Sequence, residues 1–325
     1  MRRRGEIGSL LLFCAVTLVA AALLVRPFRA KREAFDKASF ARLQQRQPEF
    51  VLIGDSLLGY SIDQATLESA LDGRHVEVLW HGGAASAAWF LYLKNFVNGA
   101  GLHPRRVFIF VHDDVLTNPR FRTTGKYLQA LQRLMTKNEP VLEQLAGVEK
   151  EKWWLQRWIA VLFSADENRA HYQEKVDARV RRLIAIKSDS ARQLERDANA
   201  IFDIPKLRSD QPIVTSEGHK PFGQAVGESF LPHILALARA GHYPLSFVRP
   251  RKRPGPYADY DTREEMRAYY ADLQAYLEAD GCELIDLTRD PAITPDMFAD
   301  SVHIGPWATV RFTRHFEEEL AGRFR

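Results

Sequence analysis

Ser56 and His303 carry the residue types that nucleophilic acyl chemistry needs, and each stands near an aspartate. A serine hydroxyl is a weak nucleophile until a base takes its proton, and an imidazole does this best when a carboxylate holds its other nitrogen. Asp300 precedes His303 by three residues in a loop. It can therefore accept the Nδ1 proton and leave Nε2 facing Ser56. We predict a catalytic triad of Ser56, His303 and Asp300.

The residues before Ser56 indicate how the chain would position it. The run 50–53 is apolar and rich in β-branched residues, it stops at Gly54 and Asp55, and an apolar helical pattern follows. This order is typical of a buried strand that turns tightly into a helix. In open parallel sheets ligands bind beyond the carboxyl ends of the strands, where a serine N–H also faces the ligand. The alternatives are that the serine only caps a helix and that the Asp–His pair is a structural loop contact.

Further strand patterns alternate with helical ones along the chain. The predicted strands are 50–56, 75–80, 106–111, 244–248 and 282–287, and the predicted helices are 60–72, 84–98, 262–279 and 307–320, with Pro306 in the first turn of the last helix. Strands and helices that alternate at this spacing predict an α/β fold, a three-layer sandwich around a parallel five-stranded sheet. The active edge would be the rim where the first three strands end.

The N-terminal residues are predicted to form a membrane anchor. Three arginines precede an almost uncharged stretch, 7–25, which is long enough to cross a bilayer as a helix. We divide the chain into a cytoplasmic tail and transmembrane anchor at 1–29, a linker helix at 30–47 and a catalytic domain at 48–325. A cleaved signal peptide is the competing interpretation.

Between about 121 and 220 the pattern is helical, and we expect a helical insert there. Trp153, Trp154 and Trp158 lie in it. They form either part of its core or a face that docks to a membrane or partner. The basic cluster 249–253 is interpreted as a solvated loop, with an anionic substrate or lipid head group as the alternative.

Charge and cysteine content exclude several classes of function. The net charge is +4, but residues 1–32 contain seven Lys or Arg and one acid, so the remainder is close to neutral and favours no nucleic-acid partner. Cys14 and Cys282 are too far apart in the predicted organisation to pair. The histidines show no metal-ligand spacing, and we expect neither a metal nor another cofactor.

The motifs Gly54-Asp55-Ser56 and Asp300 to His303 resemble those of the SGNH, or GDSL-type, hydrolase superfamily. The resemblance covers 48–118 and 242–325. It implies a flavodoxin-like fold, the triad named above, and an oxyanion hole made by the serine N–H, a glycine after the second strand and an asparagine after the third.

Gly82 is the best match for the oxyanion glycine, but Asp113 stands in the place of the asparagine. A carboxylate repels an oxyanion unless it is protonated, and a missing donor raises the barrier by about 2.7–4 kcal/mol. The third donor is left open between a protonated Asp113, His112 and Asn118, or the hole has two donors.

Anchored members of the superfamily transfer acyl groups onto cell-surface polysaccharides. The resemblance therefore implies O-acylation, most simply acetylation, of an extracytoplasmic polysaccharide through acyl-Ser56. It also implies a single-pass protein of the inner membrane with a periplasmic catalytic domain, and a multipass membrane-bound O-acyltransferase as partner. The alternatives are a carbohydrate or lipid esterase with the same triad, and a non-catalytic scaffold.

Overall fold

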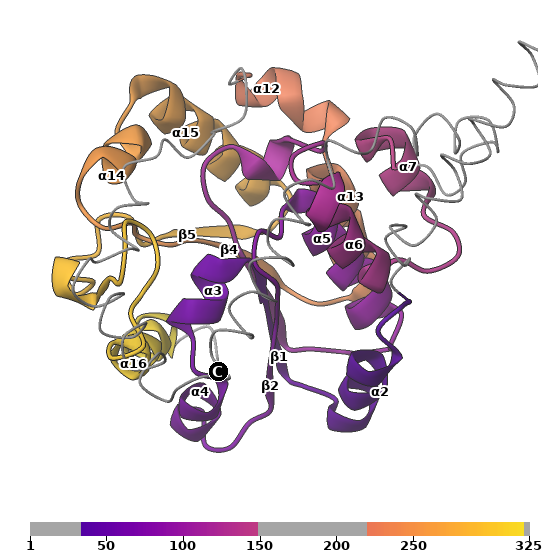
Figure 1. Ribbon diagram of the computed structural model, residues 1–325, viewed down its shortest axis with the longest axis horizontal. Helices are drawn as coiled ribbons and strands as arrows, with labels where there is room; N and C mark the ends of the chain where they lie inside the picture. The colour runs from indigo at the N-terminus through magenta and orange to yellow at the C-terminus, as the bar shows by residue number, and fades with distance from the viewer. Residues whose placement is uncertain (1–33, 149–219, 322–325) are drawn as a thin grey trace, which may run out of the picture. The chain divides into compact units, whose positions relative to one another are not determined.

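The computed structural model describes residues 34–148 and 220–321, and its centre is a parallel five-stranded sheet (Figure 1). The strands are β1 Phe50–Gly54, β2 Val76–Trp80, β3 Arg106–Phe110, β4 Leu245–Arg249 and β5 Glu283–Asp286. Their order in the sheet is β2-β1-β3-β4-β5, and every pairing is parallel. This order is the flavodoxin-like one. The predicted strands and the predicted fold class are confirmed.

Helices cover both faces of this sheet. The α-helices are α2 Lys37–Arg46, α3 Ser56–Ser61, α4 Gln64–Ala70, α5 Ser86–Leu91, α6 Gly125–Leu134, α7 Pro140–Ala146, α12 Phe222–Ala225, α13 Leu231–Gly241, α14 Pro256–Asp261, α15 Glu264–Ala279 and α16 Thr309–Leu320. A π-helix, η2 Tyr92–Asn98, continues α5. Short 3-10 helices lie at η3 Val115–Thr117, η4 Val226–Glu228 and η5 Pro295–Met297.

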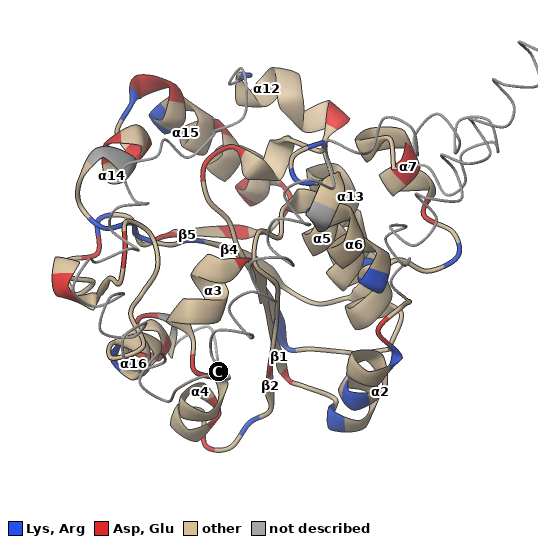
Figure 2. Ribbon diagram, viewed as in Figure 1, with Lys and Arg blue, Asp and Glu red and all other residues tan. Residues whose placement is uncertain are grey.

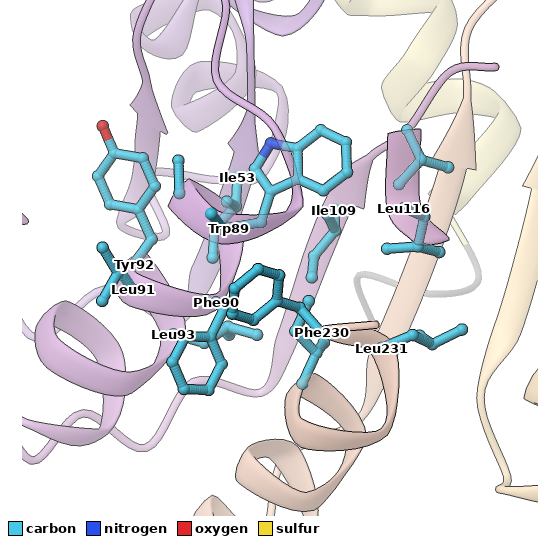
Figure 3. Close-up of a cluster of buried hydrophobic side chains, with 14 of the residues drawn as sticks. Ile53, Trp89, Phe90, Leu91, Tyr92, Leu93, Ile109, Leu116, Phe230 and Leu231 are labelled. Atoms are coloured by element: carbon cyan, nitrogen blue, oxygen red, sulfur yellow. The ribbon is translucent and has the colours of Figure 1, made fainter. Parts of the chain in front are cut away.

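Alternation along the strands divides the core into two clusters. Val51 and Ile53 of β1 face a cluster shared with α5, η2 and α13, whereas Phe50 and Leu52 face one shared with α4 and α16. Figure 3 shows the first cluster, where Trp89 and the neighbouring rings pack against strand residues. Because successive side chains of a strand point to opposite faces, both faces are apolar and both must be covered. The predicted three layers follow from this.

The helix boundaries differ from the predicted ones at two places. The predicted helix 60–72 is two helices, α3 and α4, because the side chain of Asp63 accepts the Thr66 N–H at 2.8 Å and starts a new helix. The last helix begins at Thr309, so Pro306 precedes it instead of occupying its first turn. The segment 84–98 is helical as predicted, although its second half widens into η2.

The remaining predictions concern the ends and the insert. Helix α2 occupies most of the predicted linker helix, and its Leu43 is fully buried in the core. The predicted insert begins with α6 and α7, while its tryptophans and the predicted anchor 7–25 lie outside the described residues. Among the described helices, none has the length and apolar character that a bilayer crossing requires. Figure 2 shows acidic and basic residues interspersed over the described elements.

Candidate active site

The turn after β1 presents Ser56 at the carboxyl end of the sheet. Asp55 caps α3, since its Oδ1 accepts the Leu57 N–H at 2.8 Å, and Ser56 is the first residue of that helix. A Cβ at Gly54 would lie 2.7 Å from the Leu58 Cβ, so glycine lets the helix fold back closely onto the strand. The strand, turn and helix predicted around Ser56 are therefore present.

His303 joins Ser56 to Asp300 in one hydrogen-bonded relay. Its Nε2 lies 2.9 Å from Ser56 Oγ, and its Nδ1 lies 2.7 Å from Asp300 Oδ2. With the ring proton assigned to Nδ1, His303 donates to Asp300 and accepts from the serine hydroxyl. The structure brings together the three residues that were predicted as a triad, although Ser56 and His303 are 247 positions apart in the chain.

The loop around Asp300 is built to hold its carboxylate in place. Oδ1 accepts the backbone N–H groups of Val302 and His303, both at 2.8 Å. Burial alone would raise the pKa of Asp300, but these bonds and the His303 ring lower it to about 2. The Ser301 carbonyl accepts the Arg253 N–H at 3.0 Å and ties the loop to the end of β4. Asp300 is thus an anion that orients His303, and it does not cap α16, which begins at Thr309.

Gly82, the predicted oxyanion glycine, lies in the loop that follows β2. Gly54 pairs with Trp80 in the sheet, so Gly82 follows the end of β2 by two residues, next to the strand that leads to Ser56. A Cβ at Gly82 would meet no atom within 4 Å, and Gly83 has a φ of +75°. Gly82 is thus exposed with open space at its Cα, and its role as an oxyanion donor stays a prediction.

His112 and Asp113, predicted as alternative oxyanion donors, are engaged elsewhere. His112 Nε2 lies 3.1 Å from Asp55 Oδ2 and its Nδ1 lies 2.9 Å from Asp113 Oδ2, so both ring nitrogens face carboxylates. Burial alone would lower the pKa of His112, but the two carboxylates raise it to about 9. The same contacts and Lys252 hold the pKa of Asp113 well below its ordinary value in spite of burial. An ionised, paired Asp113 cannot donate, which corrects that expectation.

Lys252 extends this buried network away from the site. Its Nζ lies 2.5 Å from Asp113 Oδ1 and 3.2 Å from Asp261 Oδ1, and Arg249 contacts Asp261 and Asp286, both at 3.1 Å. Arg249 and Lys252 are both buried. The interpretation of 249–253 as a solvated loop was therefore wrong for these two residues. Residues far apart in the chain supply the partners, so the basic run alone could not indicate them.

One group of side chains among the described residues has a metal-like arrangement. The potential ligand atoms of Asp290, His315 and Glu319 lie within 4.8 Å of one another. His315 Nε2 and Asp290 Oδ2 are already hydrogen-bonded at 2.5 Å, and the Asp290 Oδ1 accepts the Ala292 N–H. These contacts serve to fasten the loop after β5 to α16, and we assign this group no chemistry.

Among known proteins, only solved structures were found to be similar to this chain. No protein-family model and no curated protein matches the chain. It is similar to the solved structure of a protein described as an acylhydrolase from Bacteroides fragilis, with 12% identity, 89% of this chain and 99% of the other covered, and a TM-score of 0.43.

Two further solved structures are similar over the same share of the chain. A GDSL-like lipase from Bacteroides thetaiotaomicron is 10% identical, with 89% of this chain and 98% of the other covered and a TM-score of 0.41. An acetylxylan esterase from Geobacillus stearothermophilus is 10% identical, with 89% and 96% covered and a TM-score of 0.41. These levels of similarity concern the fold alone.

Proposed function

We propose that the chain is a serine-dependent acyl-transfer enzyme in which Ser56 carries the acyl group. The observation that carries this proposal is the relay from Asp300 through His303 to Ser56 Oγ, with heavy-atom distances of 2.7 and 2.9 Å. These distances are within hydrogen-bond reach, as nucleophile activation requires. The relay lies beyond the carboxyl ends of parallel strands, the usual position for a ligand site in such a sheet.

Each half of the reaction uses the same proton path. Ser56 Oγ attacks the ester carbonyl carbon while His303 Nε2 takes the hydroxyl proton, and Asp300 stabilises the imidazolium that forms. The tetrahedral intermediate then expels the alcohol, which takes the proton from Nε2, and acyl-Ser56 remains. An acceptor hydroxyl next gives its proton to Nε2 and attacks the acyl carbon. The bond between Ser56 Oγ and the acyl carbon then breaks, Oγ takes the proton from Nε2, and the new ester leaves.

Two backbone donors are proposed for the oxyanion, the Ser56 N–H and the Gly82 N–H. Ser56 is the first residue of α3, where the backbone N–H groups have no partner within the helix. His112 and Asp113 are left out because each is hydrogen-bonded within the buried network. A two-donor hole stabilises the transition state less than a three-donor hole. Such a site favours reactive acyl donors over stable esters.

For the acceptor we propose a hydroxyl of an extracytoplasmic polysaccharide. The support is the resemblance of the two motifs to anchored members of the SGNH superfamily, together with the apolar stretch 7–25. An inner-membrane location, a periplasmic domain and a multipass O-acyltransferase as acyl supplier belong to the same proposal. Hydrolysis is the competing reaction, because His303 is 27% exposed and water can reach it.

The experiment separates acylation, transfer and hydrolysis on the full-length chain. Wild type and Ser56→Ala are incubated with 4-nitrophenyl acetate, with and without a xylan-derived oligosaccharide, and the masses of protein and sugar are followed. We expect one acetyl group on wild type, none at position 56 in the variant, and acetylated sugar when the acceptor is present. Rapid release to water that the sugar does not change would identify an esterase. A folded wild type that never acquires the acetyl group would contradict the proposal and favour a scaffold.

A further inference from the structure

Exposed aromatic side chains gather around the triad. Among the described residues, the large hydrophobic side chains with high exposure are Tyr60 at 48%, Trp80 at 38%, Trp307 at 68% and Val310 at 46%. Tyr60 follows Ser56 by four positions, Trp80 ends the strand beside β1, and Trp307 follows His303 by four positions. Exposed apolar residues that gather at one site mark an interaction surface, whereas scattered ones do not.

Two of these rings are packed against glycines that leave room for them. A Cβ at Gly59 would lie 2.2–2.4 Å from three atoms of the Trp80 indole, and a Cβ at Gly305 would lie 2.5–2.7 Å from three atoms of the Trp307 indole. The Trp307 Nε1 also donates to the Asp296 carbonyl at 3.0 Å. Each indole is therefore fixed from one side while part of it stays exposed. A ring held in this way loses little conformational entropy when it binds a ligand.

The aromatic group touches the catalytic base directly. The Tyr60 ring meets the His303 imidazole edge to face, with centroids 5.1 Å apart and planes at 72°, and it meets the Trp80 ring at 5.9 Å. The Tyr60 carbonyl accepts the Thr309 hydroxyl at 3.0 Å, which joins this turn to the segment that bears Trp307. A ligand lying on Tyr60 and Trp80 would thus lie next to the Ser56 hydroxyl.

We propose that Tyr60, Trp80 and Trp307 form a platform for a pyranose ring, the one whose hydroxyl gives or takes the acyl group. The C–H bonds on the face of a pyranose carry a weak positive charge, which suits the negative face of an aromatic ring. The platform rests on the proposed acyl-Ser56 chemistry, but it does not depend on the direction of transfer. It identifies the substrate class as carbohydrate for transferase and esterase alike.

Charged groups beside Trp307 favour a sugar over a lipid. Asp296, whose carbonyl accepts the Trp307 indole N–H, pairs with Arg311 of α16 at 3.4 Å, and the two side chains are 72% and 57% exposed. Placing these charges within the hydrocarbon of a bilayer would be costly. A hydrated sugar can lie on the rings and leave both charges in water.

Binding is tested in the full-length Ser56→Ala chain, so that no turnover occurs. The probes are β-1,4-linked tetrasaccharides of xylose and of N-acetylglucosamine, followed by saturation-transfer NMR of their ring protons and by titration calorimetry. We expect at least one probe to bind, and Trp80→Ala or Trp307→Ala to weaken it about tenfold, the order known for removal of an aromatic ring that stacks on a nucleobase. Trp80→Phe should restore part of the affinity, which a general loss of folding would not allow.

Val310→Ala provides the matched control, because it removes exposed apolar area three residues from Trp307 without removing a ring face. Its affinity for the probe should equal that of Ser56→Ala alone. The platform is overturned if neither probe binds, or if both tryptophan substitutions leave the affinity unchanged. Acylation of Ser56 in the wild type is a separate measurement, so the proposed function can hold when the platform fails. A membrane contact is tested with brominated-lipid vesicles, which quench the fluorescence of tryptophans that enter the bilayer. The sugar platform is also overturned if wild type is quenched, Trp80→Phe and Trp307→Phe are not, and no sugar binds.

Discussion

Two histidine sites lie at the carboxyl edge of the sheet, and both pair an imidazole with aspartate. His303 has one carboxylate, Asp300, and its other nitrogen faces the Ser56 hydroxyl. His112 has carboxylates on both nitrogens, from Asp55 and Asp113. The side chains of the first pair are 27% and 28% exposed, whereas those around His112 are at most 13% exposed. The residue types are the same, but the surroundings differ in charge and in access to solvent.

This difference decides what each imidazole can do. A general base needs a ring nitrogen that faces the proton it takes, and the Nε2 of His303 faces the Ser56 hydroxyl at 2.9 Å. Two anions keep His112 protonated, with its pKa raised to about 9 in spite of burial. It therefore cannot take the serine proton. Its removal would leave two buried carboxylates without the cation that they share. His112 contacts the same Asp55 side chain that caps α3, so we expect it to act on Ser56 only through that cap.

The largest expected effect comes from making the same substitution in both sites. His303→Gln removes the base, and the rate of Ser56 acylation by 4-nitrophenyl acetate should fall by on the order of 10³-fold or more. His112→Gln should lower that rate by about tenfold at most in the folded fraction, since only the position of α3 is disturbed. Mass spectrometry of the protein in a time course measures both rates. Equal losses in the two variants would contradict the division into base and positioning residue.

Stability should reverse the order of the two variants. His112→Gln leaves the carboxylates of Asp55 and Asp113 buried without their shared cation, and breaking such a buried pairing costs about 3–5 kcal/mol of unfolding free energy. His303→Gln acts at a position that is 27% exposed, and it should cost under about 1 kcal/mol of unfolding free energy. Urea denaturation followed by circular dichroism gives both values. A His112→Gln protein as stable as wild type would show that the network contributes nothing to folding.

The pH dependence of stability sharpens the comparison. The pKa of His112 is raised from its ordinary value near 6.5 to about 9 in the folded protein. Its contribution is therefore complete below about pH 6.5 and is lost as the pH rises through 9, a decrease of about 3 kcal/mol. Asp300, with its pKa lowered to about 2, acts in the opposite sense, because its contribution is present above about pH 3.8 and is lost as the pH falls through 2.

Unfolding free energies of wild type and His112→Gln, measured between pH 6 and 10, test this expectation. The difference between the two proteins should shrink as the pH rises through 9, whatever other groups titrate in that range. A difference that stays constant over this range would mean that His112 is not the titrating group.

The sequence indicates the open site far better than the buried one, and the reason is physical. Ser56 follows a strand pattern, and Asp300 precedes His303 in one loop. Residues that are close in the sequence therefore determine most of the arrangement of this site. The five strands are predicted for the same reason, since burial on both faces leaves continuous apolar runs. The Lys252 to Asp113 contact joins residues 139 positions apart, and a local pattern cannot contain it.

Other differences arise where two local patterns compete. The apolar spacing of 60–72 favours one helix, but Asp63 is also a helix cap and divides it. Pro306 is a residue type that suits the start of a helix, but residues 306–308 form a turn, and α16 begins only at Thr309. The exposure of Trp80 could not be predicted, because a tryptophan that ends a strand is as compatible with the core as with the surface.

A substitution with a small effect on both rate and stability isolates Asp113, whose carboxylate links His112 to Lys252. Asp113→Asn keeps the shape and a hydrogen-bond acceptor for Lys252, while His112 retains Asp55 and Lys252 retains Asp261. Unfolding free energy should therefore fall by only about 1–2 kcal/mol, the order of one charge-assisted bond made neutral. The acylation rate should stay within about threefold of wild type, because neither Ser56 nor His303 touches this side chain. A rise in the rate would instead mean that an amide at this position acts as the missing oxyanion donor, which would bring this residue of the buried site into the chemistry of the open one.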